Sequence, residues 1–141
     1  MPNTDSRLFS FLSRLGRQRG ESPQVNIKVF NLTRHRELAN LVQLAGENNT
    51  RRRGLLGREC LNEGEGLWIV PCEAIHTFWM RFPIDLIYLD RRHRVVKVRN
   101  RVLPWRLSVC LRAHSVLELA AGTARQTQTT PGDYLVLDSG C

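Results

Sequence analysis

The sequence predicts a mainly β protein, a single compact sandwich or barrel built from short strands. Apolar segments of strand length recur along the chain between turn-rich stretches such as 62–66 and 122–131. Their spacing favours a sandwich or barrel over a parallel α/β sheet. Pro83 excludes a helix through the aromatic segment 75–85, because proline lacks an amide hydrogen and clashes with the preceding turn.

The first half of this β-rich region is expected to contain strands and one helix. Residues 25–29 alternate apolar and polar side chains, as a half-buried strand does. Residues 37–45 fit helical and strand periodicity equally well. Residues 48–58 predict one short helix, with an asparagine at its start to accept hydrogen bonds from free amides. Residues 67–70 follow a glycine-containing turn and predict a buried strand.

The second half is expected to contain only strands and turns. Strand patterns occur at 75–80, 84–89, 94–99, 114–119 and 133–137. Residues 24–141 are therefore expected to form one β-rich domain. Residues 1–23 differ, because apolar side chains repeat there at helical spacing beside arginines. This segment predicts either a basic amphipathic helix that contacts a membrane or a partner, or a frayed tail.

The segment 75–85 is the most informative part of the chain. It combines an imidazole, three large aromatic rings, a thioether, a guanidinium and a carboxylate. In an extended chain, His76 and Met80 lie on one side and Thr77 and Trp79 on the other. Neither side is uniformly apolar or polar. This mixture is typical of a lined pocket, and also of the rim of a small β core.

Glu118 lies among strongly apolar neighbours, so its carboxylate must face a pocket or find a cation. Arg58 is the expected partner of Glu118 or Asp85, either within a ligand site or as a structural tie between strands. We expect His76, Trp79, Asp85 and Glu118 to converge on one concave region. The predicted ligand-binding residues are His76, Thr77, Trp79, Met80, Asp85, Glu118 and Arg58.

These residues favour a non-catalytic module that binds a small ligand or a protein partner at the surface formed by 76–85 and Glu118. A hydrolase or transferase acting at the same pocket is the enzymatic alternative, with Cys72 and His76, or two carboxylates, as the reactive groups. Motifs for phosphate and dinucleotide binding and a serine nucleophile elbow are missing from the sequence. No cofactor is expected.

Two pairs of residues at equal spacing suggest zinc. Cys72 and His76 are four positions apart, as are Cys110 and His114, and together they make a Cys2His2 set. Four residues of strand span roughly 13 Å, however, which is too far for one ion to bridge unless the backbone turns. We therefore expect no metal site and reduced thiols.

The net charge of +8 comes almost entirely from arginine. The charge is concentrated at 51–53, 91–94 and 97–101. These clusters suggest weak binding of an anionic polymer, either nucleic acid or a membrane surface, although a merely basic surface is the favoured explanation. Because they contain no aromatic residues for base stacking, sequence-specific base recognition is not expected.

The 141 residues suffice for a core without metals or disulfides. No apolar run approaches the roughly 20 residues of a membrane-spanning helix, and the first residues lack the apolar core of a secretory signal. We therefore expect a cytoplasmic monomer.

Four motifs occur in a familiar order and spacing. They are Gly54-Leu55-Leu56-Gly57-Arg58, Glu65-Gly66-Leu67-Trp68, Phe78-Trp79-Met80 with Pro83-Ile84-Asp85, and Val116-Leu117-Glu118-Leu119 with Gly122 and Gly132-Asp133. Over residues 25–138 the chain resembles the bacterial and archaeal domain of unknown function 192 family. It departs from the family's commoner form at Leu56, Leu67 and 81–82. The resemblance implies a small jelly-roll or barrel fold and favours a strand at the end of 37–45. It implies no established activity.

Overall fold

The structure is a computed structural model, and it describes residues 25–45 and 55–140. The predicted tail at 1–23, the arginine cluster at 51–53 and most of the predicted helix at 48–58 lie outside the described residues. Residues 55–57, at the end of that predicted helix, form a turn in which Gly57 has a φ of 83°. Glycine suits this turn because it adopts positive φ without steric cost.

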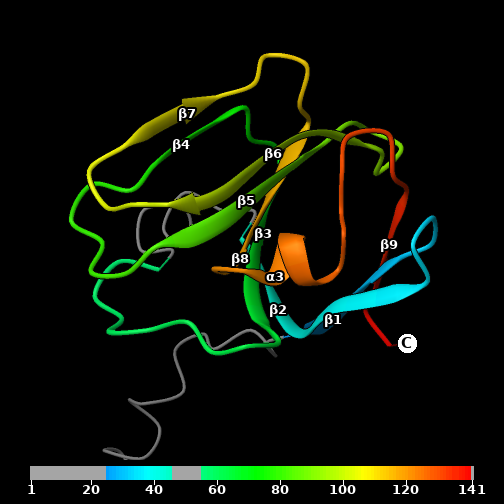
Figure 1. Cartoon of the computed structure of the whole chain (residues 1–141), viewed down its shortest axis with the longest axis horizontal. Helices are drawn as coiled ribbons and strands as arrows, with labels where there is room; N and C mark the ends of the chain where they lie inside the picture. The colour runs from blue at the N-terminus through cyan, green and yellow to red at the C-terminus, as the bar shows by residue number, and fades with distance from the viewer. Residues whose placement is uncertain (1–24, 46–54, 141) are drawn as a thin grey trace, which may run out of the picture.

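Nine strands and one short helix make up the described part of the chain (Figure 1). The elements are β1 Asn26–Asn31, β2 Arg36–Ala45, β3 Glu65–Ile69, β4 Ala74–His76, β5 Ile84–Leu89, β6 Val95–Val102, β7 Leu107–Val109, β8 Ser115–Ala120, α3 Thr123–Gln126 and β9 Leu135–Asp138. Seven strands form one sheet in the order β6-β5-β8-β3-β2-β1-β9, and β4 and β7 form a second. The prediction of a mainly β fold is confirmed.

The large sheet is antiparallel except between β2 and β3, which run in parallel. Its two edge strands approach each other at one end, where Arg94 and Tyr134 form an isolated β-bridge. The amide of Val95 also donates to the Asp133 carbonyl at 2.8 Å. The sheet therefore curls until its edges touch, but the continuous pairing of a closed barrel is not seen between the described strands.

The strand predictions at 84–89, 94–99, 114–119 and 133–137 correspond to β5, β6, β8 and β9, and the ambiguous segment 37–45 is strand. The predicted strand at 75–80 is too long, since β4 ends at His76. Beyond His76 the chain leaves the strand, since Thr77 bonds to the loop between β6 and β7 and Trp79 takes a left-handed conformation with a φ of 68°. The short strand β7 was not predicted, because it is only three residues long and two of its three side chains are exposed.

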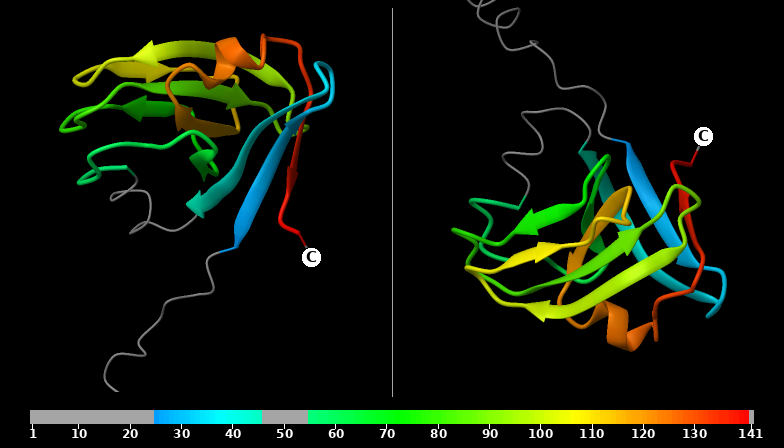
Figure 2. Two further views of the ribbon diagram at one scale, coloured as in Figure 1. Left: turned by 60° about the horizontal axis from the view of Figure 1, so that its bottom comes forward. Right: turned by 90° about the horizontal axis from the view of Figure 1, so that it is seen from above.

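Strands β5 and β8 lie at the centre of the fold and are buried along their whole length. Alternate residues on them enter two apolar clusters, one on each face of the large sheet. Leu117 belongs to the first cluster, whereas Val116 belongs to the second, which also contains Ile75 of β4 and Met80. The small sheet therefore covers the second face of the large sheet (Figure 2).

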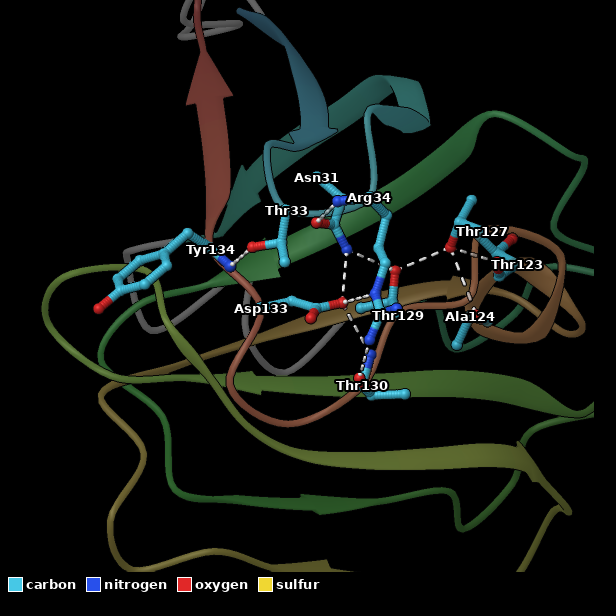
Figure 3. A network of polar contacts seen from close by, with 10 residues as sticks. All are labelled: Asn31, Thr33, Arg34, Thr123, Ala124, Thr127, Thr129, Thr130, Asp133 and Tyr134. Carbon is cyan, nitrogen blue, oxygen red and sulfur yellow. Dashed lines mark hydrogen bonds and ion pairs between the residues drawn. The ribbon is translucent and has the colours of Figure 1, made fainter.

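A buried polar network joins the carboxyl end of β1 to the loop between α3 and β9 (Figure 3). The Asn31 side-chain amide donates to the Asp133 carboxylate at 3.0 Å and to the Thr129 hydroxyl at 3.1 Å. Arg34 and the Thr130 amide donate to the same carboxylate, each at 3.0 Å. Burial alone would raise the pKa of the Asp133 carboxyl, but these hydrogen bonds outweigh it and hold the pKa below its usual value.

Candidate functional site

A cavity of about 360 Å³ lies between the second face of the large sheet and strand β4. Its walls come from β3, β4 and β8, and from the turn that contains Leu55 and Leu56. The lining residues are Leu55, Leu56, Ile69, Pro71, Cys72, Ala74, Ile75, His76, Met80 and Glu118. Apolar side chains therefore form most of the wall, with a few polar groups among them. This composition is typical of a small-molecule site.

Glu118 is placed in this cavity by the alternation of side chains along β8. Val116, two residues earlier, packs in the second apolar cluster, so Glu118 faces the same side of the sheet. It stands between Leu67 of β3 and Leu86 of β5, its partners across the two neighbouring strands. The strands pack tightly here, because a Cβ added at Gly66 would lie 2.8 Å from the Glu118 carbonyl oxygen.

The Glu118 carboxyl has no hydrogen-bond or ion-pair partner among the described residues, although only 6% of the residue is exposed. Burial raises its pKa to about 7, because removal from water disfavours the charged form. Near neutral pH this group therefore either donates or accepts a proton readily.

His76 and Met80 contribute to the same cavity, as the sequence suggested. His76 is exposed at the end of β4, and its ring stacks on Phe78 with 5.1 Å between the centroids. Met80 is buried and packs in the second apolar cluster. Sequence reasoning missed Ile69 and Ile75 as wall residues. Their apolar alternation on β3 and β4 indicated burial but not that they would face a cavity.

Thr77 does not line the cavity. It is buried, and its hydroxyl donates to the Leu103 carbonyl at 2.7 Å and accepts from the Arg106 amide at 2.9 Å. Thr77 thus fastens the loop between β6 and β7 to the end of β4. Trp79 is also outside the cavity, since it is 71% exposed and contacts Trp105 with 4.5 Å between ring centroids.

Asp85 lies on the opposite face of the large sheet from Glu118. Its neighbour Leu86 pairs with Glu118, so alternation along β5 turns Asp85 away from it. The carboxylate accepts hydrogen bonds from the amides of Arg101, Gly122 and Ala124 at 2.8, 3.1 and 2.8 Å. The expected convergence of Asp85 and Trp79 with Glu118 is therefore wrong. Asp85 instead anchors the start of α3 and the end of β6.

Arg58 pairs with neither of its predicted partners. Its guanidinium donates to the Glu65 carboxylate at 2.9 Å, and that carboxylate also accepts from the Asn62 amide. Both side chains of the pair are partly exposed, at 40% and 25%. The ion pair stabilises the turn before β3, and no described cation pairs with Glu118.

The four residues considered for zinc do not gather at one point. Cys72 and His76 line the Glu118 cavity, His114 lines a separate hollow, and Cys110 is buried. Within residues 25–45 and 55–140, no group of three or more histidine, cysteine, aspartate or glutamate side chains is arranged to hold a metal ion. The same residues include no helix long and apolar enough to cross a membrane.

Comparison with known proteins agrees with this fold. A protein of unknown function from Novosphingobium aromaticivorans is 20% identical, with a TM-score of 0.66 over 80% of this chain and 84% of its own. A candidate transcription regulator from Sinorhizobium meliloti is 21% identical, with a TM-score of 0.71 over 85% of this chain and 99% of its own. No match was found among curated proteins. The model of the DUF192 family, described as an uncharacterised ACR, matches residues 30–137, and the chain therefore belongs to this family.

Proposed function

We propose that the protein binds a small amphiphilic molecule in the Glu118 cavity. The observation that carries this proposal is a nearly fully buried carboxyl group with no partner among the described residues, facing a cavity of about 360 Å³. A buried polar group without a hydrogen bond costs free energy that a ligand donor would recover. The volume also lies within the usual range for small-molecule sites, roughly 300–1,000 Å³.

The chemistry of the walls defines the ligand. Ile69, Ile75 and Met80 offer apolar contact to a hydrocarbon body, and Glu118 accepts a hydrogen bond from a hydroxyl or a protonated amine. A carboxylate ligand is disfavoured, because it would bring a second negative charge beside Glu118. A binding role is favoured over catalysis, since Glu118 has no described polar side chain to orient it as a general base.

Hexylamine, hexanol and hexanoate test this proposal because they share one hydrocarbon chain and differ in the polar group. We expect hexylamine and hexanol to shift backbone amide resonances of residues around the cavity in nitrogen–proton correlation spectra, and hexanoate to shift them much less. Glu118→Gln should weaken hexylamine binding by about 1.5–3 kcal/mol, or roughly tenfold or more, because a charge-assisted hydrogen bond is lost.

Glu73→Gln is the matched control, because Glu73 is exposed and lies between two cavity residues, Cys72 and Ala74. This variant should bind hexylamine like the unmodified protein. Equal binding of the three probes, or binding that is the same in both variants, would show that Glu118 does not select the ligand.

A further inference from the structure

Exposed apolar side chains gather on and around the small sheet, away from the Glu118 carboxyl. Of the fourteen large hydrophobic side chains that are exposed in the described part of the chain, seven lie in two short segments, 78–79 and 103–111. We name these seven the apolar ridge. They are Phe78, Trp79, Leu103, Trp105, Leu107, Val109 and Leu111. A contiguous group of this kind marks an interaction surface more often than scattered single residues do.

The pairing of β4 with β7 explains the aliphatic part of the apolar ridge. Leu107 and Val109 point outward, at 62% and 42% exposure, whereas Ser108 between them is buried. Leu111, in the turn after β7, is 80% exposed. The outer face of the small sheet therefore presents aliphatic groups to solvent, the reverse of the usual polar outer face of an antiparallel sheet.

The backbone conformation places the two tryptophans of the apolar ridge at the surface. Trp79 and Trp105 both have left-handed conformations, with φ of 68° and 63°, which are uncommon for bulky residues. Thr77 joins the β4–β5 loop to the β6–β7 loop. Its amide donates to the Arg106 carbonyl at 2.9 Å, and its carbonyl accepts from the Trp105 amide at 3.0 Å. The β4–β5 and β6–β7 loops accordingly lie side by side at the left of Figure 1. Backbone conformations of this kind are enriched at binding sites.

Arginines are the more numerous charges beside the apolar ridge, although exposed Glu73 also lies next to it, where its carbonyl accepts from the Cys110 amide. Segments 76–84 and 100–112 contain four arginines and no acidic residue. Arg106 follows Trp105 directly and is exposed, and Arg81 and Arg101 are exposed as well. The one ion pair recorded for these arginines, Arg81 with Glu59 at 4.0 Å, is solvent-exposed and weak. The surface thus combines projecting apolar groups with exposed arginines.

We propose that the apolar ridge docks on the surface of an anionic lipid bilayer. Tryptophan prefers the boundary between hydrocarbon and headgroups, aliphatic side chains enter the hydrocarbon, and arginine meets the phosphates. Single-stranded nucleic acid fits less well, because the ridge contains four aliphatic residues. The faces that would stack on bases are also partly occupied, since Phe78 stacks on Trp105 with 5.8 Å between centroids.

Co-sedimentation of the full chain with vesicles tests this docking. We expect binding to vesicles of equal parts phosphatidylcholine and phosphatidylglycerol, much weaker binding to phosphatidylcholine alone, and a blue shift of tryptophan emission on binding. The double variant Trp79→Asn with Trp105→Asn should bind at least about tenfold more weakly, because two large apolar groups no longer enter the bilayer. Asparagine is chosen because it tolerates left-handed backbone.

Two further variants separate docking from misfolding. Leu107→Ser with Leu111→Ser removes ridge side chains outside the two loops and should weaken vesicle binding in the same direction. Leu32→Asn with Leu44→Asn changes residues of similar exposure, 51% and 52%, that lie outside the ridge, and it should leave binding unchanged. Equal losses in the ridge and control variants would overturn the proposal.

Substitution of the arginines beside the apolar ridge tests the proposal independently. Arg81→Gln with Arg106→Gln should reduce binding to the anionic vesicles and its dependence on salt, whereas Arg36→Gln on β2 should do neither. The proposal is overturned if the unmodified protein does not bind anionic vesicles but binds an oligothymidylate, and if Trp79→Asn with Trp105→Asn abolishes that binding. Concentration-dependent self-association that disappears in Trp79→Asn with Trp105→Asn, without vesicle binding, would also overturn it and assign the ridge to a second copy of this chain.

Discussion

Sequence reasoning expected Arg58 to form a buried pair with Glu118 or Asp85, and the structure shows neither pair. Arg58 pairs instead with Glu65 near the surface. Arg58→Ala should therefore lower the free energy of unfolding by less than about 1 kcal/mol, because exposed pairs contribute little. Urea denaturation measures this difference. A loss of several kcal/mol would indicate the buried pairing that the sequence suggested.

Asp85 is expected to have a much larger effect. Its carboxylate accepts from three backbone amides that have no described alternative acceptor, and the residue is completely buried. Asp85→Ala should lower the free energy of unfolding by about 2–5 kcal/mol, since unsatisfied buried donors are costly. Asp138→Ala is the control, because Asp138 is exposed and its carboxylate accepts from the Gly140 amide. Similar losses in both variants would mean that Asp85 is not an anchor.

At the scale of single residues, the sequence predicted which side chains are buried better than it predicted their hydrogen-bond partners. The apolar neighbours of Glu118 indicated a buried carboxyl that needs an outlet, and a cavity lies there. The same reasoning failed for Asp85, because its three donors are backbone amides from residues 16 to 39 positions away. Every residue type except proline supplies a backbone N–H, so no side-chain pattern predicts such a partner.

At the scale of elements, alternation and turn residues located most strands of the large sheet. They failed where the geometry depends on contacts between loops. The end of β4 and the whole of β7 are set by hydrogen bonds between Thr77 and residues 103–106, which the local sequence does not encode. The exposed leucines of β7 also lack the apolar and polar alternation that usually marks a half-buried strand.

The polar network around Asp133 holds two elements together, and its removal should be measurable. Asp133→Asn should lower the free energy of unfolding near neutral pH by about 1–3 kcal/mol, because charge-assisted hydrogen bonds from Asn31 and Arg34 are weakened. The pKa of Asp133 is lowered in the folded protein, so its contribution is present above the ordinary value of 3.8 and is lost as pH falls below it.

The difference between Asp133→Asn and the unmodified protein should accordingly shrink in acid, as measured by thermal unfolding over a pH series. Asp138→Asn serves as the comparison and should show no such difference at any pH. A stability gap for Asp133→Asn that is unchanged below pH 3.8 would contradict the network's dependence on charge.

At the scale of the whole molecule, the two sheets enclose the Glu118 cavity, and this arrangement has a consequence for stability. The pKa of Glu118 is about 7 in the folded protein against 4.5 for an ordinary glutamate. The folded state therefore binds the proton more tightly than the unfolded state does. Stability is highest below the unfolded pKa and declines as pH rises from about 4.5 to about 7, after which this contribution is constant.

Glu118→Gln should remove this decline. As pH rises across that window, the free energy of unfolding of the variant should increase by about 3 kcal/mol relative to that of the unmodified protein. Each pKa unit corresponds to about 1.4 kcal/mol. Urea denaturation at the two ends of the window measures the gain, with Glu73→Gln as the control that keeps the decline. Parallel stability curves for Glu118→Gln and the unmodified protein would mean that Glu118 is not the responsible group.

The most direct test of the central claim is a ¹³C NMR titration of the Glu118 side-chain carboxyl, assigned by its loss in Glu118→Gln. A buried carboxyl that opens into a cavity without a partner predicts a midpoint near 7. Added hexylamine should then lower that midpoint, because a bound cation favours the charged form. A midpoint near 4.5, unchanged by hexylamine, would place the carboxyl in water or beside a cation and would contradict the proposed site.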